Sequence, residues 1–328
     1  MWEAFTGSFG VRLEWCLMAA FAIDLVLGDP RWLPHPVRLI GRACTSLEAV
    51  LARVLGRGYV AGMLYTLVIV AGVWAVAAGL VGLAAAWDWR AGVAVQVLLL
   101  YTTLAARDLD VESRRVFLAL EAGDLPRARG DLSQIVGRDT AGLDESEVVR
   151  AAVETVAENT VDGVVAPLVF ALIGGAPAAL AYKAINTLDS MVGHLDERYR
   201  KFGWASARLD DAANYLPARL ARLLFPLASL ACGLDAVRCW KVVWRDGHKS
   251  PSPNAGIPEA AVAGALGVRL GGVNYYQGAV LFRPFLGDPL QPLSRRHIPA
   301  AIRLMYVVAF LTLALGTAIR MLVWHDWS

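Results

Sequence analysis

The chain has 328 residues, of which 57% are hydrophobic and 18% are charged, and its formal net charge at pH 7 is +2. Soluble domains average about 45–50% apolar and about 25% charged residues, so this balance argues against an ordinary soluble domain and indicates a polytopic membrane protein with sizeable polar loops. The small net charge and the lack of a basic aromatic patch argue against a nucleic-acid partner.

The N-terminal region is predicted to carry a membrane helix and no cleavable signal peptide. Met1–Gly10 is not basic, and the first apolar run has no small-residue exit of the A-x-A type. Leu13–Gly28 is apolar apart from Glu14 and Asp24, so we expect a short first membrane helix there.

A proline-rich loop follows this helix at Gly28–Gly41. Its prolines and flanking glycines stiffen the backbone, and its polar groups include Asp29, His35 and Arg38. Such a loop suits binding of a cofactor phosphate or carboxylate. In the alternative interpretation it is a juxtamembrane loop whose arginines meet lipid headgroups.

The clearest membrane span is Val60–Trp87, which contains no charged residue. A short turn at Trp87–Arg90 separates it from the apolar run Ala91–Ala106. These segments are therefore predicted to form a helical hairpin.

The next segment, Arg107–Asn159, is polar and helical in pattern, and it contains seven arginines. Asp144 followed by Glu147 resembles a capping box that opens a new helix. By the positive-inside rule, the arginines predict a cytoplasmic location.

Acidic side chains recur on the helix that the capping box opens. Glu154, Glu158 and Asp162 are spaced i, i+4 and i+8, so one face of a continuous helix would carry all three, with Asn159 three residues before Asp162. Stacked like charges repel, and a cation between them relieves the repulsion, so this pattern predicts Mg²⁺ ligands. The alternative is a solvated helix face near the membrane surface.

Two apolar segments flank a basic loop. Val164–Ala181 is interrupted by prolines and glycines, and it either spans the membrane or forms a re-entrant hairpin. Tyr215–Leu234 carries arginines and is interpreted as partly interfacial. The basic loop Lys183–Asn214 between them is predicted to be cytoplasmic; it would lie outside if both segments spanned fully.

Polar groups within this loop have the spacing of a nucleotide and metal site. Lys183 and Asn186 share a helical face, and Asp189 follows Asn186 by three residues. An ammonium beside amide and carboxylate groups suits ATP with a metal ion. Asp210 and Asn214, spaced i and i+4, fit an oxygen-ligand helix or an N-cap pair. A membrane-edge helix with a snorkelling lysine is the alternative for the first group.

The C-terminal third contains a predicted loop and a last span. Asp246–Pro258 is dense in glycine, proline and turn formers, and it offers donors that could bind an anion. These donors include His248, Lys249, Ser250 and Asn254. Ala260–Tyr275 is rich in small residues and weakly amphipathic, and Ala300–Trp324 is the last good span.

These elements together predict an all-α, polytopic membrane protein that forms one membrane-embedded domain over residues 1–328. Residues 107–160 and 183–214 are predicted to be helical and loop segments at the cytoplasmic face, and residues 246–258 a loop. The four cysteines form neither C-x-x-C nor a zinc spacing, so we interpret them as small buried hydrophobic residues. No Walker A, G-x-G-x-x-G or G-x-S-x-G motif is present.

Seven blocks in this order resemble the CobD/CbiB family, the membrane-bound adenosylcobinamide-phosphate synthases of cobalamin biosynthesis. They are D-L-V-L-G-D-P at Asp24–Pro30, P-H-P-V-R-L-I-G at Pro34–Gly41, V-G-R-D-T at Val136–Thr140, V-E-T-V-A-E-N-T-V-D-G-V-V-A-P at Val153–Pro167, K-A-I-N-T-L-D-S-M-V-G-H at Lys183–His194, D-D-x-x-N-Y-x-P-A-R at Asp210–Arg219 and H-K-S-P-S-P-N-A-G at His248–Gly256. The blocks span most of the chain, and their order makes the resemblance specific.

The resemblance implies an amide-forming ligase in the inner membrane, with its active face cytoplasmic. It would join a propionate of adenosylcobyric acid to (R)-1-aminopropan-2-ol phosphate or a related amino-alcohol phosphate, using ATP and Mg²⁺. Membrane lipid and other membrane enzymes of cobalamin biosynthesis are candidate partners.

From the chemistry we assign a predicted role to each group of residues. The predicted metal ligands are Glu154, Glu158, Asp162 and Asp189; the catalytic residues are Lys183, Asp210, Asp211, His248 and Lys249; and the cofactor-binding residues are Asp29, His35, Arg38, Asn159, Asn186, Asn214, Ser250 and Asn254. Lysine and histidine would neutralise phosphate charge, and Asp210 or Asp211 would accept the proton lost by the attacking amine.

Two other functions fit parts of the pattern. A Mg²⁺-dependent prenyl- or phospho-alcohol transferase also places acids and amides on helices at the cytoplasmic face, although it needs no ATP. A corrinoid transporter would account for broken helices and charges at the membrane edge. However, the polar groups here cluster in loops and loop-proximal turns and not at mid-span.

Overall fold

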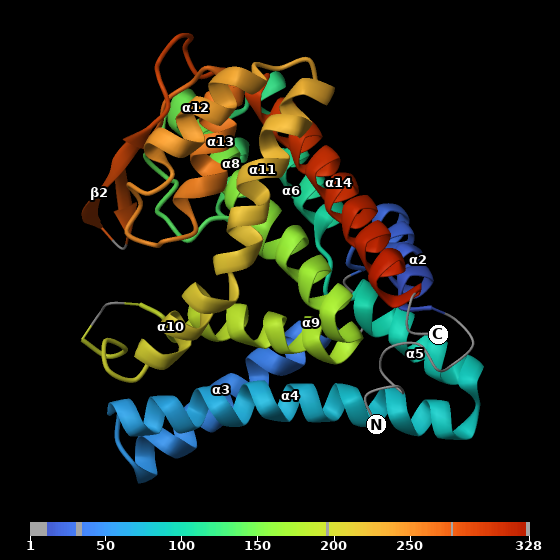
Figure 1. The fold of residues 1–328 in the computed structure, drawn as a ribbon. Helices are drawn as coiled ribbons and strands as arrows, with labels where there is room; N and C mark the ends of the chain where they lie inside the picture. The colour runs from blue at the N-terminus through green and yellow to red at the C-terminus, as the bar shows by residue number, and fades with distance from the viewer. Residues whose placement is uncertain (1–11, 31–34, 195–196, 277, 326–328) are drawn as a thin grey trace. The chain divides into compact units, whose positions relative to one another are not determined.

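The computed structural model describes residues 12–30, 35–194, 197–276 and 278–325 (Figure 1). Its contacts divide the chain into two compact units, each built from separated stretches of sequence. The first unit comprises Met1–Ala105, Ala166–Asn214 and Leu313–Ser328, and the second comprises Ala106–Val165 and Tyr215–Thr312. The prediction about a signal at Met1–Gly10 lies outside the described residues.

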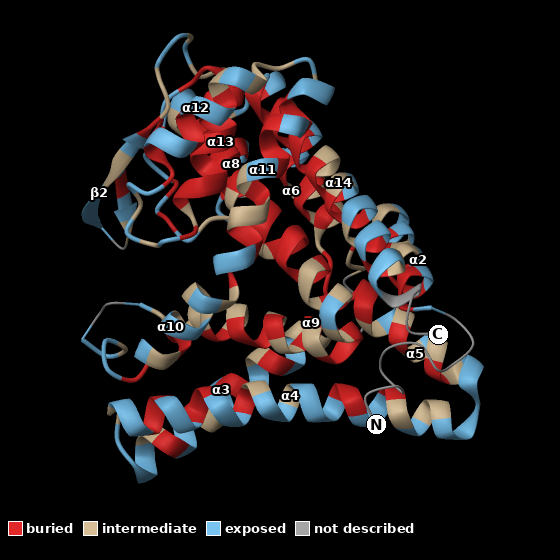
Figure 2. Cartoon of the chain, in the orientation of Figure 1, coloured by how far each residue is buried: buried red, intermediate tan, exposed pale blue. Residues whose placement is uncertain are grey.

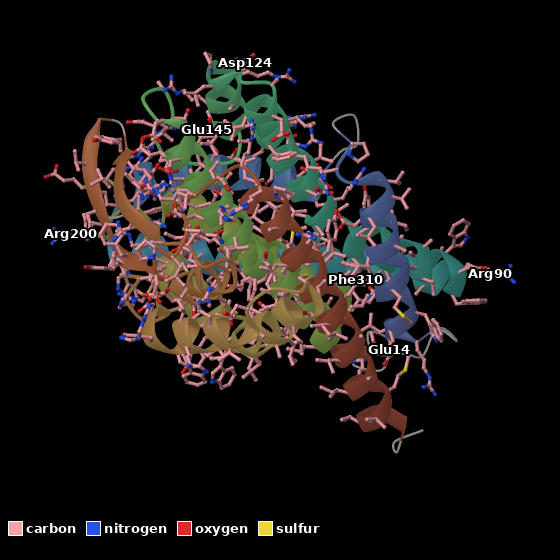
Figure 3. The ribbon with its side chains drawn as sticks, turned by 90° about the horizontal axis from the view of Figure 1, so that it is seen from above. Glu14, Arg90, Asp124, Glu145, Arg200 and Phe310 are labelled. Carbon is pink, nitrogen blue, oxygen red and sulfur yellow. The ribbon has the colours of Figure 1, made fainter. Side chains whose placement is uncertain are left out.

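The first unit is helical throughout its described part. Its helices are α2 (Leu13–Leu27), α3 (Pro36–Val54), α4 (Tyr59–Trp87), α5 (Trp89–Tyr101), α9 (Ala166–Val192), α10 (Trp204–Ala213) and the end of α14 (His297–His325). The predicted hairpin is present: α4 packs against α5, and the Asp88 side chain caps α5 by accepting from the Arg90 N–H. Figure 3 shows Arg90 at the tip of this hairpin.

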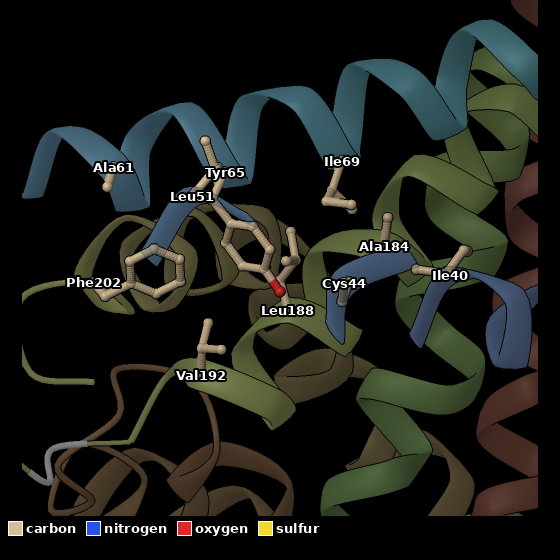
Figure 4. Packing of buried hydrophobic residues seen from close by; sticks show 10 residues of the cluster. All are labelled: Ile40, Cys44, Leu51, Ala61, Tyr65, Ile69, Ala184, Leu188, Val192 and Phe202. Atoms are coloured by element: carbon tan, nitrogen blue, oxygen red, sulfur yellow. The ribbon is translucent and has the colours of Figure 1, made fainter. Parts of the chain in front are cut away.

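A buried apolar cluster joins α3, α4, α9 and the segment before α10 (Figure 4). Tyr65 of α4 lies against the Phe202 ring, with 5.0 Å between the ring centroids, and Leu188 and Val192 of α9 are fully buried in the same cluster. This packing fixes the C-terminal end of α9 and the chain that leads into α10.

The second unit contains seven helical segments wholly within its described residues, together with a small sheet. These elements are α6 (Ala106–Glu121), α7 (Leu125–Leu132), α8 (Glu145–Thr160), the π-helix η1 (Val161–Val165), α11 (Tyr215–Ala231), α12 (Ala236–Asp246), α13 (Gly256–Leu266), and the strands β1 (Leu270–Tyr276) and β2 (Ala279–Leu286). The first part of α14 also belongs to this unit. The predicted capping box is confirmed, because Asp144 and Glu147 exchange both of its hydrogen bonds at the start of α8.

Four stretches of described helix are long and apolar enough to cross a membrane. They are Tyr59–Trp87, Trp89–Glu121, Glu145–Val192 and His297–Val323. The prediction of an all-α polytopic membrane protein is therefore confirmed. Figure 2 shows exposed positions along α4. The sequence of α4 contains no charged residue, so these exposed positions suit contact with lipid better than contact with water.

The broken apolar segment Val164–Ala181 is interrupted at two glycines. Gly174 and Gly175 have non-helical backbone angles and divide α9 into two legs. Gly175 has a φ of 64°, and a Cβ there would lie 2.3 Å from Nε2 of Gln96, so both conformation and space require glycine. Pro177 lies in the first turn of the second leg, where a missing N–H costs no helical hydrogen bond.

The all-α prediction included no strand, yet β1 and β2 form an antiparallel hairpin. The predicted loop Asp246–Pro258 is also shorter than expected, since α13 already begins at Gly256. Gly271 and Gly272 have positive φ angles of 83° and 101° at the irregular start of β1. The valine and aromatic residues that follow them favour a strand.

Close packing on α4 gives a test of the first unit. A Cβ on Gly62 would lie 1.9 Å from the backbone oxygen of Phe202, whereas Gly79 on the same helix has nothing within 4 Å. We expect Gly62→Ala to destabilise the protein by about 1–3 kcal/mol through overpacking. Thermal unfolding in detergent should show a lower midpoint for Gly62→Ala than for wild type and an unchanged midpoint for Gly79→Ala. Equal midpoints for the two variants would contradict the packing described.

Candidate functional site

Two of the predicted polar blocks come together in the first unit, where α9 packs against α10. Asn186 and Asp189 lie on α9, and Asp210 lies on α10, with Asn214 as the residue that ends it. The Asp210 carboxylate accepts a hydrogen bond from Nδ2 of Asn214 at 3.0 Å. The Asp189 carboxylate and the Asn186 amide lie close enough to Asp210 to act on its charge. We call these four residues the α9–α10 cluster.

Asn214 is held at both ends of its amide. Its Oδ1 accepts from the hydroxyl of Tyr182 at 2.8 Å, while its Nδ2 donates to Oδ2 of Asp210, and the residue is only 1% exposed. An amide that is buried and bonded in this way orients its neighbour. Asn214 therefore positions Asp210, and its cofactor-binding role stays a prediction.

Asp210 has an unusual protonation equilibrium. Burial, followed by the charge of Asp189, raises its pKa to about 7, against the opposing hydrogen bonds from the amides of Asn214 and Asn186. Two carboxylates this close resist being charged together, and a proton or a divalent cation relieves the repulsion.

Three further residues, Lys183, Asp211 and Gly193, lie near the cluster in the sequence. Lys183 is half-buried on α9, one turn before Asn186. Asp211, predicted alongside Asp210, instead forms an ion pair with Arg208 at 3.1 Å. Gly193 lies against Asp189, where a Cβ would come within 2.0 Å of the carboxylate oxygen.

The loop before α3 is held by local bonds. Nδ1 of His35 accepts from the Val37 N–H at 3.3 Å and caps α3, so its Nε2 carries the proton and donates to Asp29 at 3.1 Å. Arg38 is exposed in the first turn of this helix. His35 and Asp29 thus stabilise the helix start, and a ligand role for them stays a prediction.

In the second unit, Glu154 is the centre of a buried network. Its Oε2 accepts from Arg138 at 2.6 Å and its Oε1 from the Gly271 N–H at 2.8 Å. Arg138 also donates to Oδ1 of Asn274, and Arg150 donates to the carbonyls of β1. Glu154 is only 1% exposed and ties α8 to β1, which differs from the predicted role of metal ligand.

The predicted acidic stripe extends past the end of a regular α-helix. The α-helix ends at Thr160, and Asp162 lies in the π-helical turn η1. The prediction assumed one regular α-helix through all three acids, and this regular helix ends before Asp162. Asn159 donates back to the Thr155 carbonyl of its own helix.

A further buried acid, Glu259 on α13, was missed in the sequence. It is 3% exposed and pairs with Arg283 of β2 at 3.3 Å. Burial raises its pKa well above the usual range, and the charges of Glu158 and Glu154 add to this. The signal was available, because Glu259 is the one acid in an otherwise apolar and small-residue helix.

Two polar side chains of the predicted anion-binding loop already have partners within the protein. Lys249 pairs with Asp246 at 2.6 Å, and Oδ1 of Asn254 accepts from Arg219 at 2.5 Å. Burial of Asp246 acts to raise its pKa, but hydrogen bonds from Arg245, Lys249 and the Gly287 N–H prevail and lower it to about 2. His248 is exposed and Ser250 is half-buried in the loop.

The predicted metal ligands are divided between the units. Glu154, Glu158 and Asp162 belong to the second unit and Asp189 to the first. Among the residues described, no group of three or more His, Cys, Asp or Glu side chains could hold a metal ion. Binding of Mg²⁺ by these residues stays a prediction.

The role of Glu154 can be tested by stability. Removing one partner of a buried ion pair leaves the other charge uncompensated, so we expect Glu154→Gln to cost about 3–5 kcal/mol of stability. Glu145→Gln, which alters an exposed acid on the same helix, should cost at most about 1 kcal/mol. Unfolding is measured in detergent without Mg²⁺. If Glu154→Gln is less stable than wild type only when Mg²⁺ is added, the result would instead support a metal ligand.

The whole chain can be compared with known proteins. The family model described as CobD/Cbib protein matches residues 17–305. The chain belongs to the CobD/CbiB family. It is 56% identical over 290 residues to the "Cobalamin biosynthesis protein CobD" of Geobacter metallireducens, covering 88% of this chain and 91% of that protein.

Other CobD/CbiB relatives are similar over nearly their full length. The chain is 47% identical over 311 residues to the protein named CobD from Klebsiella pneumoniae, and 46% identical over 311 residues to the protein named CbiB from Salmonella typhimurium. In both comparisons the alignment covers 94% of this chain and 97% of the relative. No solved structure matches the chain.

Proposed function

We propose that this member of the CobD/CbiB family is an enzyme of cobalamin biosynthesis that forms an amide bond. It joins a propionate of adenosylcobyric acid to (R)-1-aminopropan-2-ol phosphate or a related amino-alcohol phosphate, with ATP and Mg²⁺, at the cytoplasmic face of the inner membrane. Family membership and the names of the relatives support the pathway and a corrinoid substrate. The α9–α10 cluster is the observation that carries the chemistry.

The reaction needs activation of a carboxylate, because a carboxylate has no good leaving group. Its oxygen attacks the γ-phosphorus of ATP, which gives an acyl phosphate and releases ADP. The amine nitrogen then attacks the acyl carbon, the C–O bond to phosphate breaks, and the nitrogen loses a proton. The protein must therefore position three anionic groups, compensate phosphate charge and accept one proton.

The α9–α10 cluster fits these needs. Its donor set of carboxylate and amide oxygens suits Mg²⁺, which takes one or two protein carboxylates and completes its shell with water and substrate phosphates. Asp189 and Asn186 would hold the ion, which when bound neutralises charge on the phosphates. Lys183 on the same helix adds a cation for a phosphate oxygen, and Asp210, oriented by Asn214, accepts the amine proton.

The test is a defined reaction with detergent-purified protein, adenosylcobyric acid, aminopropanol phosphate and Mg-ATP. Mass analysis should show a corrinoid heavier by one amino-alcohol phosphate less one water, with one ADP formed for each amide. Omission of ATP should abolish the product. Product formed without nucleotide would indicate a transferase, and unchanged corrinoid accumulating inside proteoliposomes would indicate a transporter.

A further inference from the structure

Helices α11 and α12 of the second unit present an outward apolar surface, which we call the α11–α12 face. The two helices pack against each other, and Figure 2 shows exposed positions on both of them, several of which carry large apolar side chains. Exposed apolar side chains here include Leu216, Leu223, Leu227 and Leu230 on α11 and Val237, Trp240 and Trp244 on α12, each at least 44% exposed.

Both helices are short. α11 has 17 residues and α12 has 11, and neither is among the candidate spans. Helix α11 is apolar on both sides. Its buried residues include Pro217, Ala221 and Phe225, and its exposed residues include the leucines named above. A short helix of this kind, beside exposed tryptophans, is typical of a surface that lies in the headgroup region of a bilayer.

Two arginines on α11 border this face without a carboxylate partner. The guanidinium of Arg222 lies 4.4 Å from the centroid of the Trp244 ring, and that of Arg219 lies 3.6 Å from the centroid of the Tyr215 ring. Among the described residues no carboxylate oxygen lies within 4.0 Å of either guanidinium. Nε of Arg222 also has no acceptor in the described chain.

The two arginines of α12, in contrast, have carboxylate partners. Arg238 pairs with Asp235 at 2.8 Å, and Arg245 pairs with Asp246 and Asp288. The protein therefore compensates those charges itself. Arg219 and Arg222 are one helical turn apart with no such compensation, so an external anion would relieve their mutual repulsion.

We propose that the α11–α12 face lies in the membrane interface and that Arg222, together with Arg219, binds the phosphate of an anionic phospholipid headgroup. The planar guanidinium fork matches two phosphate oxygens, and stacking on Trp244 holds the fork at the headgroup level. The exposed leucines then face acyl chains. This site contains no residue of the α9–α10 cluster, although Arg219 also donates to Oδ1 of Asn254.

The test compares lipid binding by full-length protein in detergent. Native mass spectrometry counts the phosphatidylglycerol and phosphatidylcholine retained, with the same acyl chains on both lipids. Wild-type protein should prefer phosphatidylglycerol. Arg222→Gln should lower its retention about fivefold, the effect expected of one cation at a membrane surface. Arg222→Lys should fall between the two, because it keeps the charge but loses the fork.

Lys241→Gln is the matched control, because Lys241 is an exposed cation on α12 outside the arginine pair. It should keep its retention within about twofold of wild type. Equal losses in Lys241→Gln and Arg222→Gln would refute the site, as would full retention by Arg222→Gln. If Arg222→Gln does not fold, the comparison of Arg222→Lys with wild type decides. Inorganic phosphate that binds through Arg222, with no preference between the lipids, would also overturn the proposal.

Discussion

Asp189→Asn should abolish most of the ATP-dependent amide formation while the protein still inserts and folds. Asp189 lies on α9 beside Asp210 and Asn186, and in our proposal it supplies the charged ligand for Mg²⁺. Its amide analogue keeps the shape but loses the negative charge. We expect turnover to fall by about 10²–10³, the scale of losing one preorganised electrostatic group in an active site.

The measurement is turnover as a function of Mg²⁺ concentration, with Mn²⁺ binding followed by electron paramagnetic resonance as a readout independent of activity. Glu197→Gln is the control, since Glu197 is an exposed acid of the same unit. It should leave both readouts near the wild-type values. Asp189→Asn protein with near-normal turnover and unchanged Mn²⁺ binding would show that the metal ligand lies elsewhere.

Features encoded by neighbouring residues were predictable from the sequence. The capping box of Asp144 and Glu147 needs only residues three apart, and it forms as expected. The α4–α5 hairpin follows from two apolar runs joined by a short turn that Asp88 caps. Local hydrogen bonds and hydropathy determine these elements, so distant contacts could not alter them.

Features that depend on distant partners were not predictable in the same way. Glu154 was assigned to a metal from its helical spacing, but its carboxylate is bound by Arg138 and by the backbone of Gly271, 117 residues further along the chain. Glu259 meets Arg283 only because the hairpin of β1 and β2 returns toward α13. Nothing in the local pattern of either acid reveals such a partner.

The candidate site was predictable in part from the sequence. The spacing of Asn186 and Asp189 and of Asp210 and Asn214 marked both blocks as helical oxygen donors. Their meeting depends on the segment between α9 and α10, which Phe202 anchors against Tyr65. The sequence could therefore supply the chemistry of each block, but only the fold brings Asp210 against Asp189 and shows that Asn214 orients it.

Adjacent aspartates on α10 allow the proposed proton acceptor to be tested with little other change. Asp210 faces the cluster and is hydrogen-bonded by Asn214, whereas Asp211 forms an ion pair with Arg208. Loss of a general base costs about 10²–10⁴ in rate, so we expect Asp210→Asn to reduce turnover by that factor. Asp211→Asn removes the same charge one residue away and should stay within about threefold of wild type, because a partly exposed ion pair contributes little.

Single-turnover kinetics identify the step that is lost. If Asp210 accepts the amine proton, Asp210→Asn should still form ADP when the corrinoid acid is present, but amide should follow slowly, because activation of the carboxylate precedes the proton transfer. Equal losses of ADP formation and amide formation would place Asp210 in metal or nucleotide binding instead. A larger defect in Asp211→Asn than in Asp210→Asn would refute the assignment, since Asp210 is the aspartate that Asn214 orients and whose charge Asp189 influences.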